Sequence, residues 1–249
     1  PANWRKLMDY GCGTLGDMGV HIFDTPYNAL KLDVPRTITT ECRPSNGFGF
    51  PEHNIVTYEF PGTQYTAGSL KWIWYDGEGA PRMSEDLILP GMEMKKDKKT
   101  QDAGARDKIS LDAGVAAGNE LPEQGAMFVG EEGRLLLPHF MQLPRKIRKG
   151  KYVDISKEIA KVSKEHNLGE PIRDYDREGP KHYHQFVDAC LGKATTTAPF
   201  DYAARLTETI LLGTIAGRFP GETLHWDAVT AKFKEEKANQ YLAGDYREF

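Results

Sequence analysis

Residues 9–24 hold the pair of side chains with the clearest chemical meaning in this 249-residue chain. Asp17 and His21 are four residues apart in a segment that the sequence predicts to be a helix, beginning near Thr14, whose hydroxyl would cap it, and ending near Lys31. Residues four apart share a helical face, so a carboxylate would lie beside an imidazole. Such a pair can exchange a proton with a substrate hydroxyl near neutral pH. The alternative is an ordinary surface pair worth roughly 0.3 kcal/mol.

The same stretch contains a lookalike of a nucleotide-binding loop. Gly11, Gly13 and Gly16 fit the pattern G-x-G-x-x-G, in which backbone amides approach a pyrophosphate. That mechanism needs a buried parallel strand directly before the loop. The preceding residues, PANWRKLMDY, include three charges and no β-branched side chain. We therefore expect a loop that leads into a helix and not a cofactor site.

Several segments together resemble one enzyme family. Trp4-Arg5 is followed by Gly-x-Leu-x-Asp-x-Gly-x-His-x-x-Asp, and further similar segments cover most of the chain: His182–Cys190, Phe200–Gly213, Leu224–Asp227, Asn239 and Tyr246-Arg247. This set resembles the C-terminal domain of the Gfo/Idh/MocA oxidoreductases, the glucose-fructose oxidoreductase and inositol dehydrogenase family, in a branch common in Bacteroidetes and Planctomycetes.

The resemblance implies a fold, an activity and site residues. The fold would be α+β, an open and largely antiparallel sheet with helices packed on one face and oligomer contacts on the other. The activity would be hydride transfer between NAD or NADP and a hydroxyl-bearing carbon of a sugar, glycoside or cyclitol. His21 would be the acid/base and Asp17 its neighbour that orients the substrate or the ring. Arg5 and Trp4 would contact substrate, with Arg5 near the nicotinamide, and His182 would be a further substrate contact.

The chain departs from the family in one large respect. It has no strand, phosphate loop and ribose-binding acid in order, and no Glu-Lys-Pro segment with the family's catalytic lysine. The resemblance therefore implies the C-terminal portion of a longer enzyme whose N-terminal Rossmann domain, absent from this chain, binds most of the NAD(P). We expect residues 1–249 to form one substrate-binding and oligomerisation domain that is inactive alone.

Two other classes of function are compatible with the same residues. Asp17, His21 and Asp24 recur at i, i+4 and i+7, so they could hold a divalent metal in a sugar isomerase or hydrolase. No other residues show metal-ligand spacing, and the dehydrogenase hypothesis requires no metal. The chain could also be a noncatalytic binding or assembly module.

Composition restricts the partners. The net charge of -4 gives no basic footprint for nucleic acid, and no apolar run approaches the ~20 residues of a membrane span. Cys12, Cys42 and Cys190 are scattered, which predicts lone buried thiols and neither disulfides nor a zinc site. The expected partners are a carbohydrate and further copies of the chain, and localisation is left open.

Strand patterns follow the first helix. The sequence predicts strands over residues 37–42, 54–60, 70–75, 126–129 and 134–137, joined as an antiparallel meander, with helices over 183–191 and from Tyr202 onward and a short extended segment at 224–226. The lysine-rich, glycine-rich stretch of about 94–124 is expected to be a solvated loop insertion, with a lid as the alternative. Trp72 and Trp74 share one strand face, and we expect that face to be an oligomer interface, with stacking on a sugar ring as the alternative. Trp226 is expected in the core.

Overall fold

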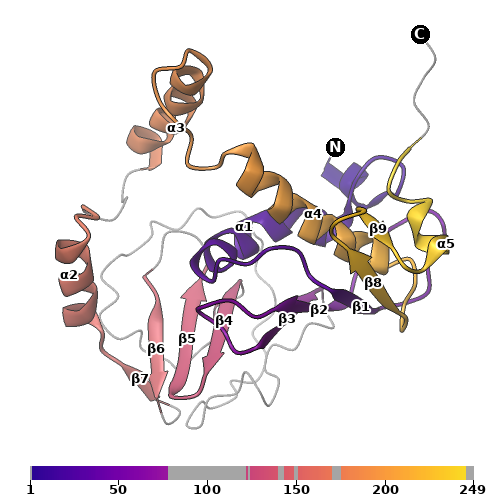
Figure 1. Ribbon diagram of the computed structural model, residues 1–249, viewed down its shortest axis with the longest axis horizontal. Helices are drawn as coiled ribbons and strands as arrows, with labels where there is room; N and C mark the ends of the chain where they lie inside the picture. Colours follow the sequence, from indigo (N-terminus) through magenta and orange to yellow (C-terminus); the bar gives the residue numbers. More distant parts are fainter. Residues whose placement is uncertain are drawn as a thin grey trace. The chain divides into compact units, whose positions relative to one another are not determined.

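The computed structural model describes residues 2–77, 122, 124–139, 143–148, 151–169 and 175–244. Two compact units divide the chain: Pro1–Pro81 with Thr196–Phe249, and Arg82–Thr195. The first unit contains η1 (Ala2–Lys6), α1 (Gly13–Ala29), β1 (Thr37–Glu41), β2 (Asn54–Pro61), β3 (Ser69–Asp76), α4 (Phe200–Ala216), β8 (Thr223–Asp227), β9 (Lys232–Phe233) and α5 (Glu236–Asn239), labelled in Figure 1. Its two parts are therefore separated in sequence by the whole second unit.

The helix α1 confirms the prediction for the Asp17/His21 segment, with one correction at its start. It spans Gly13–Ala29, and its N-cap is Cys12, which makes no side-chain capping bond, so Thr14 does not cap it. The helix ends in a left-handed residue, Lys31, with φ 52°. The backbone N–H groups of Lys31 and Leu32 donate to carbonyls of the last turn, which closes the helix end.

A five-stranded antiparallel sheet forms the centre of the first unit, in the order β3-β2-β1-β8-β9. The register pairs Ile38 of β1 with Tyr58 of β2 on one side and with Leu224 of β8 on the other. The predicted strands and their antiparallel pairing are thus confirmed. The sequence did not predict that β8, about 180 residues further along, adds to the free side of β1.

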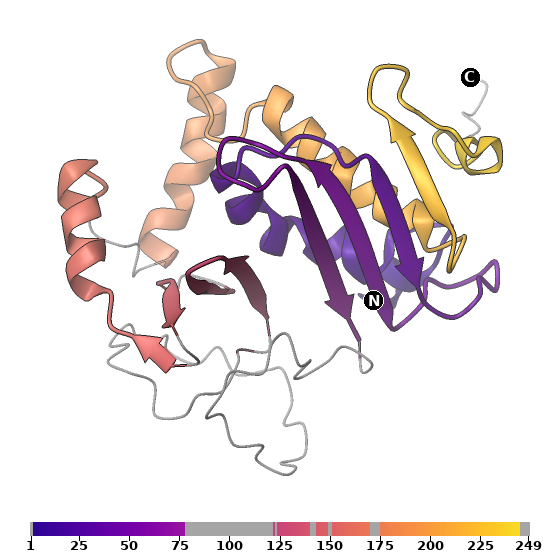
Figure 2. The same ribbon diagram turned by 60° about the horizontal axis from the view of Figure 1, so that its bottom comes forward.

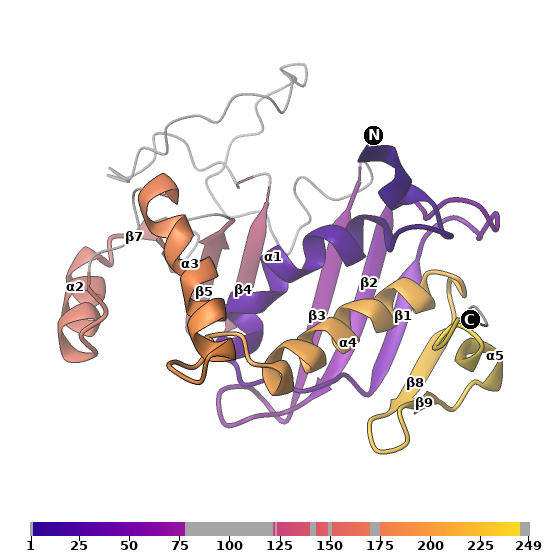
Figure 3. The same cartoon turned by 90° about the horizontal axis from the view of Figure 1, so that it is seen from above.

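The helices α1 and α4 lie side by side across one face of this sheet, as Figure 3 shows. Between the helices and the strands lies the core, in which Phe23, Ile38 and Tyr58 are fully buried. Glycines permit the close approach, because a Cβ on Gly213 would stand 1.9 Å from the Tyr58 hydroxyl. The expected α+β architecture, an open antiparallel sheet with helices on one face, is confirmed.

The two neighbouring tryptophans of β3 face the core, so their prediction as an interface was wrong. Trp74 is 7% exposed, and the ring of Trp72 stacks on Phe23 with centroids 4.3 Å apart. The alternation along β3 was correctly recognised, but both faces of this strand carry large apolar side chains, so alternation alone could not choose the buried face. The core prediction for Trp226, at 8% exposed, was right.

The opposite face of the sheet is not covered by α1 or α4, and in Figure 2 its strands lie in front of those helices. Register places side chains of this open face in rows across the strands. One row is polar: His225, Thr37, Glu59, Lys71. The next is Thr223, Thr39, Thr57, Ile73, in which the Thr39 and Thr223 hydroxyls are 2.9 Å apart. The face is therefore rich in β-branched side chains.

The second unit contains a four-stranded antiparallel sheet, in the order β4-β5-β6-β7, and two helices, counted over the described residues. Its elements are β4 (Gly125–Gly130), β5 (Gly133–Pro138), β6 (Arg145–Arg148), β7 (Lys151–Val153), α2 (Ser156–Glu165) and α3 (Tyr175–Cys190). The hairpin β4-β5 confirms the sequence prediction, and the basic segment from Arg145 is a strand with Ile147 buried. Most of the predicted loop insertion at 94–124 lies outside the described residues.

Two patterns that indicate burial were misleading. Along the helix predicted over 183–191, the spacing of Phe186, Val187 and Cys190 is that of an apolar core face, but Phe186 and Val187 are 62% and 52% exposed. Cys12 and Cys190 are exposed and only Cys42 is partly buried. Apolar spacing shows which side chains share a helical face, but not whether another element covers that face. None of the described helices has the length and apolar character needed to cross a bilayer.

Candidate functional site

The predicted acid/base pair lies on α1, but its carboxylate contacts another residue. Asp17 and His21 are both in α1, one turn apart, as the sequence predicted, and His21 is exposed. The Asp17 Oδ2 atom accepts a hydrogen bond from Arg5 Nη1 at 3.0 Å, and the two side chains are 35% and 48% exposed. Asp17 therefore orients the guanidinium of Arg5 in this structure.

Three of the predicted site residues are thus brought together. The 3-10 helix η1 carries Trp4 and Arg5, and the Arg5 guanidinium carbon lies 6.0 Å from the centroid of the Trp4 ring. Trp4 itself is 52% exposed. The arrangement presents an aromatic surface, hydrogen-bond donors and a carboxylate near the first turns of α1. These groups suit the recognition of a polar ring compound with hydroxyl groups.

The glycine loop before α1 does not fit a pyrophosphate. The element before it is the 3-10 helix η1 and not a strand. The backbone N–H of Gly11 donates to Leu7 O at 2.9 Å, and that of Gly16 donates to Cys12 O at 3.2 Å, so neither is available to phosphate oxygens. A Cβ on Gly11 would lie 2.3 Å from Arg5 O, which explains this glycine by packing. A dinucleotide does not fit this loop.

The metal alternative is not supported by the geometry of its three residues. Asp24 Oδ1 accepts a 2.6 Å hydrogen bond from the Tyr202 hydroxyl, and Asp17 is engaged by Arg5. Within the ranges that the structure describes, no group of three or more His, Cys, Asp or Glu side chains is placed to hold a metal ion. Asp24 instead ties α1 to the first turn of α4.

The remaining predicted residue, His182, lies in α3 of the second unit and is exposed. Its role as a substrate contact stays a prediction. The helix begins seven residues before it, so His182 is inside the helix and not at its head. Pro180 lies within this helix. In a sequence, a proline at this point normally indicates that a helix starts at the proline and not before it.

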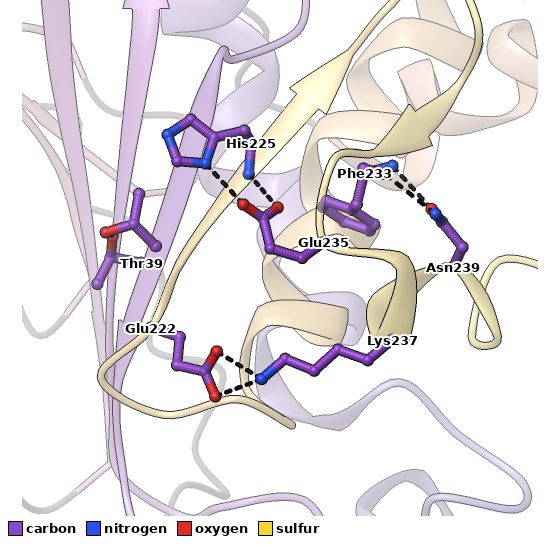
Figure 4. Close-up of polar contacts among 8 residues, drawn as sticks. Thr39, Glu222, His225, Phe233, Glu235, Lys237 and Asn239 are labelled. Carbon is purple, nitrogen blue, oxygen red and sulfur yellow. Dashed lines mark hydrogen bonds and ion pairs between the residues drawn. The ribbon is translucent and has the colours of Figure 1, made fainter.

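A second histidine–carboxylate pair, which sequence reasoning did not assign, joins β8 to the segment before α5. The ring Nδ1 of His225 lies 2.8 Å from Glu235 Oε1, while the His225 backbone N–H donates to Glu235 Oε2 at 2.7 Å (Figure 4). Burial acts to raise the pKa of Glu235, but the hydrogen bonds from His225 and from the backbone of Glu235 itself, together with the electrostatic effect of His225, lower that pKa. The carboxylate thereby fixes the imidazole at the margin of the open face.

Further contacts in Figure 4 hold the same C-terminal elements. The Asn239 side chain donates to Phe233 O and accepts from Phe233 N, at 3.0 and 2.8 Å, as a neighbouring strand would. Lys237 bonds both carboxylate oxygens of Glu222. Asn239 and the segment around His225 were noted in the sequence, and their structural part is to fasten β9 and α5 to the sheet.

A buried carboxylate lies at the end of β3. Asp76 is 6% exposed and accepts hydrogen bonds from Trp74 Nε1 at 2.7 Å and from Asn54 Nδ2 at 2.8 Å. Loss of hydration raises the pKa of Asp76, and the two hydrogen bonds oppose that rise. Because both oxygens are satisfied by neighbours in the same sheet, Asp76 supports the sheet and does not face a substrate.

Described residues of the first unit line two hollows. One, of about 20 Å³, lies between the start of α1 and the end of α4 and has room for a water molecule. The other, of about 430 Å³, lies where α1 ends and α4 begins. Neither hollow is lined by Asp17 or His21. Comparison of the chain with protein-family models and with curated proteins gives no match.

Proposed function

We propose that this chain is the substrate-side, C-terminal part of an NAD(P)-dependent oxidoreductase of the Gfo/Idh/MocA type, acting on a sugar, glycoside or cyclitol. The observation that carries the proposal is the Arg5–Asp17 ion pair beside an exposed Trp4, one helical turn from His21. The open antiparallel sheet with its helical layer is the fold that the proposal requires. The proposal rests on the motif resemblance for its chemistry and on this geometry for its site.

The residues of this chain would bind the substrate and move its proton. The indole of Trp4 offers a flat apolar surface to a ring, while Arg5 and Asp17 offer donors and acceptors to neighbouring hydroxyls. His21 would take the proton of the reacting hydroxyl, since an imidazole titrates near neutral pH. Asp17 would orient the substrate or the ring of His21, and it also holds the guanidinium of Arg5. Nicotinamide binding is assigned to a further domain, because the loop at Gly11 does not fit a dinucleotide.

Ring-proton NMR of the seven histidines tests substrate contact on this chain directly. With myo-inositol and glucose as probes, we expect a shift of the His21 signal, identified by its loss in His21→Asn. His166→Asn removes another exposed histidine and is the matched control. In the full-length enzyme, His21→Asn should lower turnover by roughly 10²-fold or more. Probes that leave the His21 signal unmoved, together with near-normal turnover, would remove this residue from the mechanism.

A second proposal concerns the open face of the sheet, which we infer to be a contact between copies of the chain. Its central row of Thr39, Thr57 and Ile73 is partly exposed and rich in β-branched side chains, and the helices α1 and α4 lie on the other face of the sheet (Figure 3). Light scattering after size exclusion should give a mass above 27.9 kDa. Ile73→Glu should lower that mass, whereas Val162→Glu on the exposed side of α2 should not. A strictly monomeric wild-type chain would contradict the assembly role.

A further inference from the structure

The larger hollow of the first unit has the composition of a small-molecule site. Its volume, about 430 Å³, is within the range of ligand pockets, roughly 300–1,000 Å³. Its walls include two aromatic and two aliphatic residues: Tyr27, Tyr202, Leu32 and Pro199. The rings of Tyr27 and Tyr202 pack on each other, with centroids 6.0 Å apart and an inclination of 60°. Tyr27 is 1% exposed, so the partly exposed Tyr202 and the exposed Pro199 provide the accessible apolar surface. Such walls suit a flat, largely apolar body.

The polar groups on one side of this hollow are hydrogen-bond donors. Lys31 Nζ donates to Asn28 Oδ1 at 3.0 Å, which engages the acceptor atom of the Asn28 amide. The Asn28 Nδ2 group and the remaining Lys31 protons are therefore donors next to the hollow. Among the described residues Lys31 forms no ion pair. Asp33 is paired with Arg205, and Asp24 accepts a hydrogen bond from Tyr202. Within those residues, the hollow thus has a cation beside it that no carboxylate compensates.

The backbone of Lys31 has a left-handed φ of 52°, the conformation that glycine adopts without strain. Asn167 and Ala231 share this conformation, so it does not by itself indicate a ligand. It does supply a variant, Lys31→Gly, that removes the side chain at a position where the backbone suits glycine.

The two tyrosine hydroxyls of the hollow are either engaged or buried. The Tyr202 hydroxyl donates its one hydrogen to the Asp24 carboxylate at 2.6 Å and also lies 2.9 Å from the Asp24 carbonyl oxygen. The Tyr27 hydroxyl is buried out of contact with solvent. The partly exposed ring of Tyr202 is therefore the aromatic surface that a ligand would contact.

We propose that this hollow binds a small aromatic carboxylate, with its ring against Tyr202 and Pro199 and its carboxylate on Lys31 and Asn28. The site lies at the end of α1 opposite to Asp17, so it is separate from the proposed oxidoreductase site and neither depends on the other. A carboxylate suits two adjacent donors, one of them charged, better than any neutral group.

Equilibrium dialysis of the full chain with 2-naphthoate tests the proposal, with 2-naphthamide as a neutral molecule of the same shape. We expect 2-naphthoate to bind with a dissociation constant of about 1 mM or tighter, and the amide at least about tenfold more weakly. Lys31→Gln should weaken 2-naphthoate about tenfold, and Lys71→Gln, which removes a lysine from the open face, should leave binding unchanged.

Lys31→Gly separates a ligand-binding role from a structural one. Glycine relieves the left-handed strain, so the thermal midpoint of this variant should be unchanged or higher while 2-naphthoate binding is lost. Equal binding of 2-naphthoate and 2-naphthamide, equal effects of the Lys31 and Lys71 substitutions, or no binding at millimolar concentration would each overturn the proposal.

Discussion

Gly213 of α4 lies close to Tyr58 of β2 and to Leu15 of α1, and this packing can be tested by adding one methyl group. In Gly213→Ala the new Cβ would stand 1.9 Å from the Tyr58 hydroxyl and 2.7 Å from Leu15 Cδ2. Since real Cβ contacts are almost never below 3.0 Å, the hydroxyl would have to move by more than an ångström. Tyr58 is fully buried, so the shift must be passed to neighbouring core side chains.

The expected magnitude is a balance of two terms. Alanine in a helix interior gains about 1 kcal/mol over glycine, whereas overpacking of a core costs about 1–3 kcal/mol, occasionally more. The overlap is severe, so we expect a net destabilisation of about 1–3 kcal/mol. Gly68→Ala is the matched control, because a Cβ there meets no atom of the described residues within 4 Å. Its effect should be within about 0.5 kcal/mol.

Tyr58→Phe provides the decisive second variant. The Tyr58 hydroxyl is buried without a hydrogen-bond partner among the described residues, so its removal should stabilise the protein by about 1 kcal/mol. It also removes the atom with which the methyl group of Gly213→Ala collides, so the double variant should be more stable than the sum of the single effects by about 1 kcal/mol or more. Urea unfolding of the wild type, both single variants and the double variant measures this coupling. Strict additivity, or a Gly213→Ala effect no larger than that of Gly68→Ala, would refute the packing argument.

Three further predictions concern titratable groups. Burial raises the pKa of Asp76 from 3.8, so the contribution of this group to stability is fully present below that value and is lost as pH rises through the folded-state pKa. The stability of Asp76→Asn should therefore increase relative to that of the wild type as pH rises above 4. Urea midpoints that show the opposite slope would contradict this. The pKa of Glu235 is lowered, so its contribution to stability is present above the unfolded-state value of 4.5 and is lost as pH falls. Glu235→Gln should therefore lower the free energy of unfolding by about 1 kcal/mol at pH 7 and by less in acid, as measured by the same urea unfolding series. A thiol reagent counted by mass spectrometry should modify the exposed Cys12 and Cys190 before Cys42, whose burial raises its pKa; faster labelling of Cys42 would be inconsistent with the structure.

Local patterns in the sequence were sufficient to predict the elements whose partners are close in the chain. The period of α1 and the alternation of β2 and β3 are properties of single segments, and the turn between those strands joins neighbours, so their bounds and pairing could be predicted within a residue or two. The pairing of β1 with β8 depends on segments about 180 residues apart, which no local pattern encodes.

The candidate site was predictable to a similar extent. The helical spacing of Asp17 and His21 placed them on α1, but a contact between Arg5 and Asp17 depends on how η1 folds back onto α1. The pair of His225 and Glu235 had a weaker signal: a histidine at an alternating position of a strand and a glutamate ten residues later, beyond a turn. That signal becomes meaningful only when β8 and β9 are known to pair.

The pairing of Ile38 with Leu224 has a consequence for biosynthesis. A ribosome that adds about 5–20 residues per second needs about 10–40 s to pass from one partner to the other. During that interval the three N-terminal strands and α1 are exposed without α4 and β8, and the hydrophobic side of their sheet is open to solvent and to other nascent chains. Expression of this protein should therefore be sensitive to translation speed and to chaperones that shield apolar surface until synthesis has passed residue 227.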